Sequence, residues 1–167
     1  WNDVQKFLRK LNGLLPGSQI TLPTEAEWEY ACRAGSQTAF SFGNSINTGH
    51  VNFDGTTATI YVRNGNCRER TVPVKFFSAN SWGLHQMHGN VLEWCADALR
   101  HYEKKAMEDP GLTDAVNPPE LRATNRAIRG GAWNYDARLI RSAYRLSFRR
   151  DWLVNFLGFR LACRFDN

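Results

Sequence analysis

The segment from Ser36 to Asn80 constrains the fold more than any other part of the chain, because it shows no sustained hydrophobic period. It is rich in Gly, Asn, Ser and Thr, and only Thr59 to Arg63 and Val72 to Phe76 favour strand formation. Loops of this length inside a domain are usually functional or are held by many hydrogen bonds. We therefore expect a small regular framework that holds long, irregular loops.

The first helix of this framework is predicted at the N-terminus. Apolar residues recur at helical spacing between Val4 and Leu11. Asn2 or Asp3 suits the N-cap, and Gly13 suits the end of the helix. The apolar face that should pack on the core consists of Val4, Phe7, Leu8 and Leu11.

The second helix is predicted after a turn at Pro16 and Gly17. Thr24 and Glu27 have the spacing of a capping box, and acidic residues in the first turn interact favourably with the helix dipole. Gly35 suits the end of this helix.

The C-terminal part of the chain is predicted to form strands. Gly89 to Trp94 should be a turn that runs into a strand, whereas Lys104 to Pro119 is charged and proline-rich and should be a surface excursion. The later segments that alternate in the manner of strands are Ala127 to Trp133, Arg138 to Arg145 and Gly158 to Arg164. Two helices, a small antiparallel sheet and long loops make one α+β domain over residues 1–167.

Positive charge is concentrated near the C-terminus. Residues 122–167 contain ten Arg, no Lys and three Asp, a net charge of +7, whereas residues 1–121 carry a net charge of −2. An arginine-rich surface can bind nucleic acid, but the absence of Lys is unusual for a surface that follows phosphates. The alternative is that arginine, with its fork of donors, cross-links loop-rich structure. No apolar run approaches the roughly 20 residues that span a bilayer, and the first residues lack a signal-peptide profile.

Neither the cysteines nor the histidines form a strong metal or catalytic motif. The cysteines are far apart and include no CxxC pair, so we expect reduced, mostly buried thiols. His85 and His88 are three residues apart, but glycines flank the pair and a third ligand is missing. No nucleophile elbow, P-loop or HExxH motif occurs. The four cysteines are Cys32, Cys67, Cys95 and Cys163.

Four segments resemble, in the same order, motifs of the formylglycine-generating-enzyme (sulfatase-modifying-factor) family. They are LPTEAEWEYA at Leu22 to Ala31, GNVLEW at Gly89 to Trp94, RGGAW at Arg129 to Trp133 and GFR at Gly158 to Arg160. Trp1-Asn2-Asp3 is also similar to the start of the first helix in that family. The resemblance covers essentially the whole chain and implies a C-type-lectin-like fold, with the part of the family domain that precedes this point missing here.

Members of this family that are enzymes oxidise a substrate cysteine with two of their own cysteines, which bind copper as thiolates. Aligned on Gly130 to Trp133, those two positions are Tyr135 and Ile140 in this chain. Neither side chain supplies a thiolate, so the resemblance implies a member without this catalytic activity. The alternative is an enzyme, or an accessory protein, with altered chemistry.

The same resemblance implies a calcium site, because relatives bind calcium through loop oxygens near the Gly-Asn-Val segment. Asn90 and Glu93 are the candidate ligands, with Asn52 and Asp54 as a second group. The alternative is that Asn90 and Glu93 cap and brace the backbone.

A second, narrower resemblance covers residues 133–160. Trp133, Ala137-Arg138, Arg141-Ser142-Ala143 and the final GFR are similar to the framework of variable regions in proteins diversified by diversity-generating retroelements. In those systems a reverse transcriptase randomises the adenines of a copied template. An Asn codon treated in this way cannot become Lys, Glu, Gln, Met or Trp. Between Asn134 and Phe156 no Lys, Glu, Gln or Met occurs, and Trp152 is the exception.

The residues between these framework positions are the candidate ligand-binding residues. Their mixture of aromatic and polar types is typical of interfaces with macromolecules, and we expect the ligand to be a protein rather than a nucleic acid. The candidates are Tyr135, Asp136, Leu139, Ile140, Tyr144, Leu146, Ser147, Phe148, Trp152, Leu153, Val154 and Phe156. The alternative is an ordinary strand-loop-strand whose core residues are Leu139, Ile140, Leu153, Val154 and Phe156.

Overall fold

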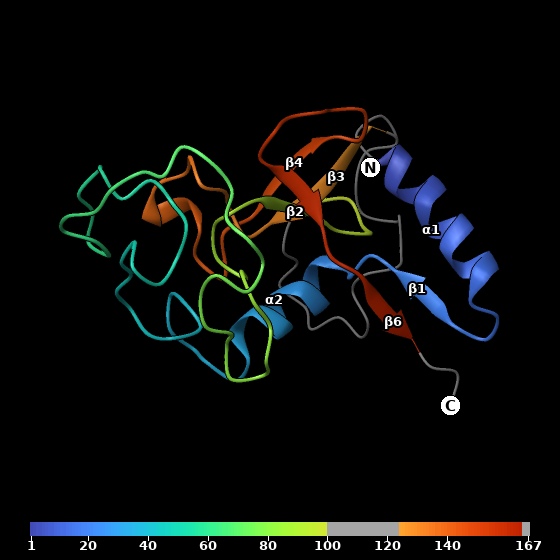
Figure 1. Cartoon of the computed structure of the whole chain (residues 1–167), viewed down its shortest axis with the longest axis horizontal. Helices are drawn as coiled ribbons and strands as arrows, with labels where there is room; N and C mark the ends of the chain where they lie inside the picture. The colour runs from blue at the N-terminus through green and yellow to red at the C-terminus, as the bar shows by residue number, and fades with distance from the viewer. Residues whose placement is uncertain (100–123, 165–167) are drawn as a thin grey trace, which may run out of the picture.

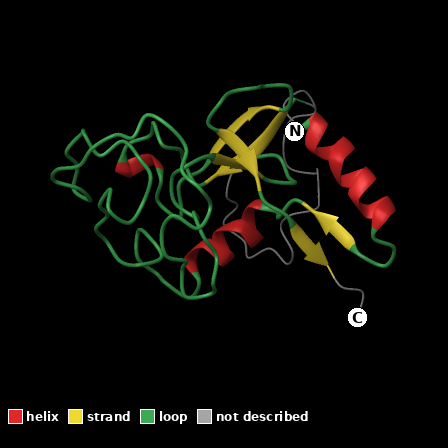
Figure 2. Ribbon diagram, in the orientation of Figure 1, coloured by secondary structure: helices red, strands yellow, loops and turns green. Residues whose placement is uncertain are grey.

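The computed structural model describes residues 1–99 and 124–164, and it shows the predicted α+β arrangement (Figures 1 and 2). In chain order, the elements are α1 (Asn2–Leu14), β1 (Gln19–Thr21), α2 (Glu25–Arg33), β2 (Leu92–Trp94), β3 (Asn125–Arg129), the 3-10 helix η2 (Ala137–Leu139), β4 (Leu146–Arg149), β5 (Leu157–Phe159) and β6 (Ala162–Arg164). Figure 1 shows loops gathered around η2 on one side of the molecule, and α1 with the paired strands β1 and β6 on the other.

Helix α1 is amphipathic as predicted, although its ends differ from the prediction. Leu8 is buried, whereas Phe7 on the same predicted face is 44% exposed. The N-cap is Trp1, without a side-chain capping bond, so the prediction of Asn2 or Asp3 was wrong. The Trp1 indole donates a hydrogen bond to the carbonyl of Cys95 at 3.0 Å, which anchors the start of the helix one residue earlier.

Helix α2 begins with the predicted capping box. Glu27 N donates to Thr24 Oγ1 at 3.2 Å, and Thr24 N donates to Glu27 Oε2 at 2.8 Å. The helix ends at Arg33, where Ala34 adopts the left-handed conformation with a φ of 45°. Gly35 follows with a φ of 88°, so the predicted stop lies one residue beyond the C-cap.

The strands form two small sheets. One has the strand order β4-β3-β2-β5, with antiparallel pairing of β3 to both β4 and β2 and parallel pairing of β2 to β5. The other pairs β1 with β6 in antiparallel fashion and so joins the two ends of the described chain. The predicted small sheet is therefore present, but one of its pairings is parallel.

Two strand predictions at the C-terminal end were wrong in detail. The segment from Arg138 to Arg145 contains part of η2 and turns rather than a strand, because Asp136 Oδ1 accepts the backbone N–H of Arg138 at 2.8 Å and caps η2. The segment from Gly158 to Arg164 is divided between β5 and β6, which belong to different sheets. The chain breaks there because Arg160 turns toward a buried carboxylate.

The long segment between α2 and β2 contains turns and isolated bridges, and its described residues form no strand. The strand tendency of Thr59 to Arg63 and of Val72 to Phe76 is therefore not realised. The loops instead bury an apolar cluster of their own, made of Phe40, Ile46, Val51, Phe53, Val62, Ala137 and Ile140. The surface excursion predicted at Lys104 to Pro119 lies outside the described residues.

A second apolar cluster joins α1 to the larger sheet through Leu8 and Ile128, and a third surrounds Trp28 of α2. Gly89 lets the loops approach the sheet, because a Cβ there would lie 2.1 Å from Asn52 O.

All four cysteines are free thiols; Cys32 and Cys95 are buried, whereas Cys163 is exposed. No helix among residues 1–99 and 124–164 is long and apolar enough to cross a membrane.

Candidate ligand-binding surface

Glu93 of β2 is a buried centre of the framework. Arg160 donates to its carboxylate from Nε at 2.5 Å and from Nη2 at 2.7 Å. Trp28 Nε1 donates to Glu93 Oε2 at 2.6 Å. These contacts join three of the four family-like motifs, and a buried ion pair of this kind is costly to break.

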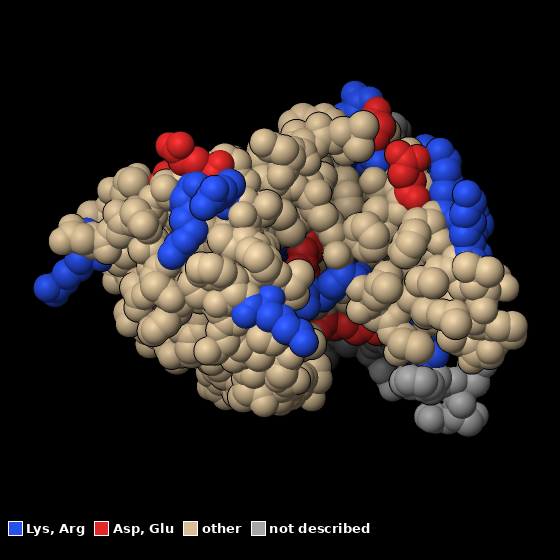
Figure 3. Space-filling view, viewed as in Figure 1, with Lys and Arg blue, Asp and Glu red and all other residues tan. Residues whose placement is uncertain are grey.

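Helix α2 is tied to the rest of the framework by further ion pairs. Arg145 donates to both carboxylate oxygens of Glu25, at 2.6 and 2.5 Å. Arg129, whose side chain is fully buried, binds Glu29 and the carbonyl of Tyr144. These contacts confirm the predicted cross-linking by arginine. On the face shown in Figure 3, Lys and Arg lie in separate groups rather than in one continuous basic surface.

The predicted calcium ligands take part in contacts with the protein. Asn90 Oδ1 accepts hydrogen bonds from Asn52 Nδ2 at 3.0 Å and from Val72 N at 2.9 Å. The Glu93 carboxylate binds Arg160 and Trp28. Asp54 Oδ1 accepts hydrogen bonds from the backbone N–H and the hydroxyl of Thr56 in its own loop. Asn52 Oδ1 is buried and has no hydrogen-bond partner among the described residues. These contacts support the bracing role of Asn90 and Glu93, and calcium binding stays a prediction.

The two histidines have different partners. Ser41 N donates to His88 Nε2 at 3.0 Å, so His88 Nδ1 carries the proton and donates to the carbonyl of Ile140 at 2.8 Å. Burial lowers the pKa of His88 to about 4 and raises the pKa of nearby Cys32 to about 12. The thiol and the imidazole are therefore both neutral near pH 7, unlike an activated Cys-His pair. His85 Nδ1 lies 2.9 Å from the carbonyl oxygen of Phe77. The described residues contain no group of three or more His, Cys, Asp or Glu suited to a metal ion.

The positions implied for copper do not fit that metal. Ile140 is fully buried in the loop cluster and has no ligating atom, while Tyr135 is half-buried and packs against two apolar clusters. A copper site held by two thiolates cannot form at these positions.

Two exposed candidate residues lie in the connection between β4 and β5, next to the larger sheet. Trp152 is 47% exposed and Leu153 is 85% exposed, in the connection between β4 and β5. The Phe148 ring on β4 lies 4.6 Å from the Trp152 ring, centroid to centroid. Beside them is an open hollow of about 360 Å³, lined by Arg149, Asp151, Trp152, Leu153 and Val154.

The candidate residues nearest η2 lie closer to the core. Ile140 was wrongly predicted to face a ligand, because it packs tightly over Gly131, where a Cβ would lie 2.2 Å from Ile140 Cγ2. Tyr135 links the two groups of candidates, since its ring centroid lies 6.1 Å from that of Phe156. Asp136 caps η2. The remaining candidates are all half-buried: Leu139, Tyr144, Leu146, Ser147, Val154 and Phe156.

The alternative prediction, in which the apolar candidates form a core, is therefore correct for Ile140 and wrong for Leu153. The structure divides the segment into a part that packs on the scaffold and a part that faces solvent.

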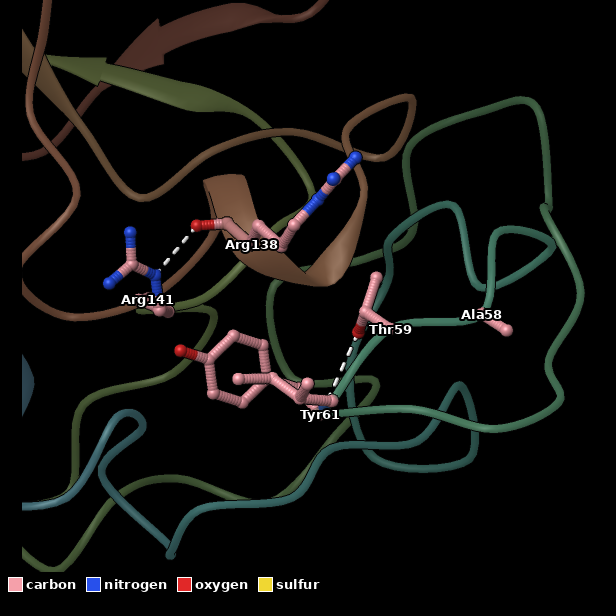
Figure 4. A pocket seen from close by; sticks show the side chains of 6 residues that line it. Ala58, Thr59, Tyr61, Arg138 and Arg141 are labelled. Carbon is pink, nitrogen blue, oxygen red and sulfur yellow. Dashed lines mark hydrogen bonds between the residues drawn. The ribbon is translucent and has the colours of Figure 1, made fainter.

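A further hollow, which the sequence did not indicate, lies between η2 and a loop. Its volume is about 410 Å³ (Figure 4). It is lined by Ala58, Thr59, Ile60, Tyr61, Arg138 and Arg141. Nothing in the sequence connects residues 58–61 with η2, because their proximity depends on the path of the loop.

Comparison with known proteins identifies relatives along nearly the whole chain. A family model described as "Sulfatase-modifying factor enzyme 1-like domain" matches residues 1–165. The serine/threonine-protein kinase pkn1 of Chlamydia caviae is 33% identical over 144 residues, which cover 84% of this chain and 20% of that protein. The formylglycine-generating enzyme of Streptomyces coelicolor is 32% identical over 184 residues, covering 97% of this chain and 50% of the enzyme.

Two solved structures are similar as well. Treponema denticola variable protein 1 is 28% identical with a TM-score of 0.64, covering 87% of this chain and 48% of that one. PvdO from Pseudomonas aeruginosa is 28% identical with a TM-score of 0.71, covering 99% of this chain and 60% of that one. The chain spans 20% of the length of the Chlamydia caviae kinase and 50% of the length of the Streptomyces coelicolor enzyme.

Proposed function

Because the chain belongs to the family of sulfatase-modifying factor enzyme 1-like domains, we propose that it is a binding protein that uses this scaffold to present variable residues to a protein ligand. The observation that carries the proposal is the exposure of Trp152 and Leu153 beside Phe148. We call Phe148, Trp152, Leu153 and Val154 the display surface. The likeness to Treponema denticola variable protein 1 supports the same function.

The display surface has the composition of an interface. Large apolar side chains that cluster at the surface commonly mark an interaction site. Trp and Phe provide rigid contact area with few rotatable bonds, and Trp is enriched among the residues that contribute most to binding. The Arg149–Asp151 ion pair, with both side chains largely exposed, adds a polar rim to the same turn.

The structure also supports the idea that this segment tolerates variation. Trp152 and Leu153 lie in a connection between strands, where substitutions disturb the core least. The framework positions around them are fixed by contacts elsewhere, such as the Arg160–Glu93 pair. Variation at exposed Trp152 and Leu153 is therefore compatible with a constant scaffold.

A pair of surface libraries tests this function. One library randomises the candidate positions other than Ile140, and a matched library randomises Asp3, Lys6, Arg9 and Lys10 on the exposed face of α1. After sorting for folded protein, both are selected for binding to the same purified test proteins. We expect binders that differ at the display surface from the first library only. Equal yields from the two libraries, or loss of the fold throughout the first, would contradict the proposal.

An enzymatic function is the second candidate, because the relatives include formylglycine-generating enzymes. The copper chemistry that the family resemblance implies does not fit Tyr135 and Ile140. Metal analysis of the purified protein after incubation with Cu(I) separates the two functions. We expect no stoichiometric copper, and one tightly bound copper per chain would favour the enzyme.

A further inference from the structure

We propose that the hollow between η2 and residues Ala58 to Tyr61 is a carboxylate-binding subsite that receives an acidic side chain of the protein ligand (Figure 4). The inference rests on the proposed function, since it names one chemical feature of the ligand. It is carried by the difference between Arg141 and the arginines that form buried ion pairs, such as Arg129 and Arg160.

Arg141 is a positioned cation without a carboxylate partner among the described residues. Its Nε donates to the carbonyl of Arg138 at 2.8 Å, and its guanidinium carbon lies 6.0 Å from the centroid of the Tyr61 ring. Among residues 1–99 and 124–164, no aspartate or glutamate forms an ion pair with Arg141. The two Nη atoms have no partner in this part of the chain, so the side chain is oriented and its paired donors remain available.

Arg138, which also lines the hollow from η2, is already neutralised. Asp136 accepts from Arg138 Nε at 3.0 Å and from Nη2 at 2.8 Å. This pair leaves Arg141 as the one uncompensated charge among the described residues that line the hollow. A guanidinium with two free Nη groups matches the two oxygens of one carboxylate, through charge-assisted hydrogen bonds.

The apolar walls favour a side chain over a small inorganic anion. The Tyr61 ring and Ile60, which is 88% exposed, provide surface against which methylene groups can pack. Phosphate sites normally offer several backbone or side-chain donors at once, whereas this hollow offers one free guanidinium. The chemistry therefore fits an aspartate or glutamate of a polypeptide.

The subsite would also be independent of variation at the display surface. Arg138 and Arg141 occupy framework positions of the segment, whereas the candidate variable residues lie between and beyond them. Different variants would then share one anchor for an acidic residue and differ in the neighbouring contacts.

The test is an NMR titration of backbone amides with N-acetylglutamate methylamide, using the uncharged N-acetylglutamine methylamide as the control probe. We expect saturable shifts at residues 58–61 and 138–141 with the glutamate probe only. The variant Arg141→Gln should bind the glutamate probe about tenfold more weakly or worse, as expected for loss of a charge-assisted contact. The matched variant Arg9→Gln, which removes an exposed arginine of α1 outside the hollow, should bind unchanged.

Several results would overturn the subsite. They are the absence of saturable shifts, equal shifts with the glutamine probe, unchanged binding by Arg141→Gln, or tighter binding of inorganic phosphate than of the carboxylate. Backbone spectra of each free variant establish that the fold is intact. If the carboxylate fails to bind while library binders still depend on the display surface, the subsite falls and the proposed function stands. If the carboxylate binds but no library binder depends on the display surface, the hollow is an anion site and the proposed display function falls.

Discussion

Two sets of ion pairs in this molecule use the same residue types for different purposes. In the framework, the partners are 67 to 120 positions apart and join α2, the sheet and the chain after β5. In the solvent-facing turns, Arg138 and Arg149 bind aspartates only two positions away. A long-range pair fixes one element against another, whereas a local pair only shapes its own turn. The same segment therefore contains Arg145, which fixes α2, and Arg138, which shapes only its own turn.

The largest expected effect comes from breaking a framework pair. Glu93→Gln leaves Arg160 and the Trp28 indole without their shared carboxylate. We expect a loss of about 3–5 kcal/mol in the free energy of unfolding, as for other buried pairs that lose one partner. Urea unfolding followed by tryptophan fluorescence measures it.

The matched control is Asp151→Asn, which breaks the local pair with Arg149. Both side chains are more than half exposed, so we expect no measurable change in the unfolding midpoint. Equal losses in the two variants would remove the distinction between framework and local pairs.

Within the candidate variable segment, Ile140 and Leu153 should differ sharply in their effect on stability. Ile140→Ala opens a cavity in the loop cluster and should cost about 2–5 kcal/mol. Leu153→Ala removes an 85% exposed side chain and should change the stability by no more than about 0.5 kcal/mol. Thermal unfolding of both variants measures the difference, and a costly Leu153→Ala would place that residue in the core.

His88 makes the junction between the loops and η2 sensitive to acid. Burial lowers its pKa from 6.5 to about 4, so between these values the unfolded chain binds a proton that the folded chain does not. Its contribution to stability is therefore complete above about pH 6.5 and is lost as the pH falls toward 4. The loss should reach up to about 3 kcal/mol.

Denaturant unfolding as a function of pH measures this contribution. His88→Gln should flatten the dependence between pH 6.5 and 4. An unchanged profile in His88→Gln would assign the acid sensitivity to other groups.

The parts of the fold that depend on nearby residues could be predicted from the sequence. The capping box of α2 lies within four residues, and the apolar period of α1 lies within one helix, so both were found. The strand predicted at Arg138 to Arg145 failed because the cap at Asp136 overrides a weak alternation. The short strands β1 and β4 had no local pattern strong enough to reveal them and are defined by their pairing partners.

The candidate site could be proposed from composition, but the burial of its residues could not be predicted. The codon argument and the framework motifs indicate the segment, yet they cannot distinguish buried Ile140 from exposed Leu153. That difference arises from the close approach of Gly131, which only the folded chain brings under Ile140. The hollow beside Arg141 was missed for the same reason, since residues 58–61 reach it through the path of the loop.

The most direct test of the account is to sequence the locus for several kilobases on both sides of the gene. The account predicts a reverse-transcriptase gene and a near-copy of codons 133 to 160 that differs only at adenines. The differences should fall on the candidate codons and spare those of Arg145 and Arg160. Ordinary flanking sequence with no second copy would contradict the account, and the exposed turn at Trp152 and Leu153 would then need another explanation.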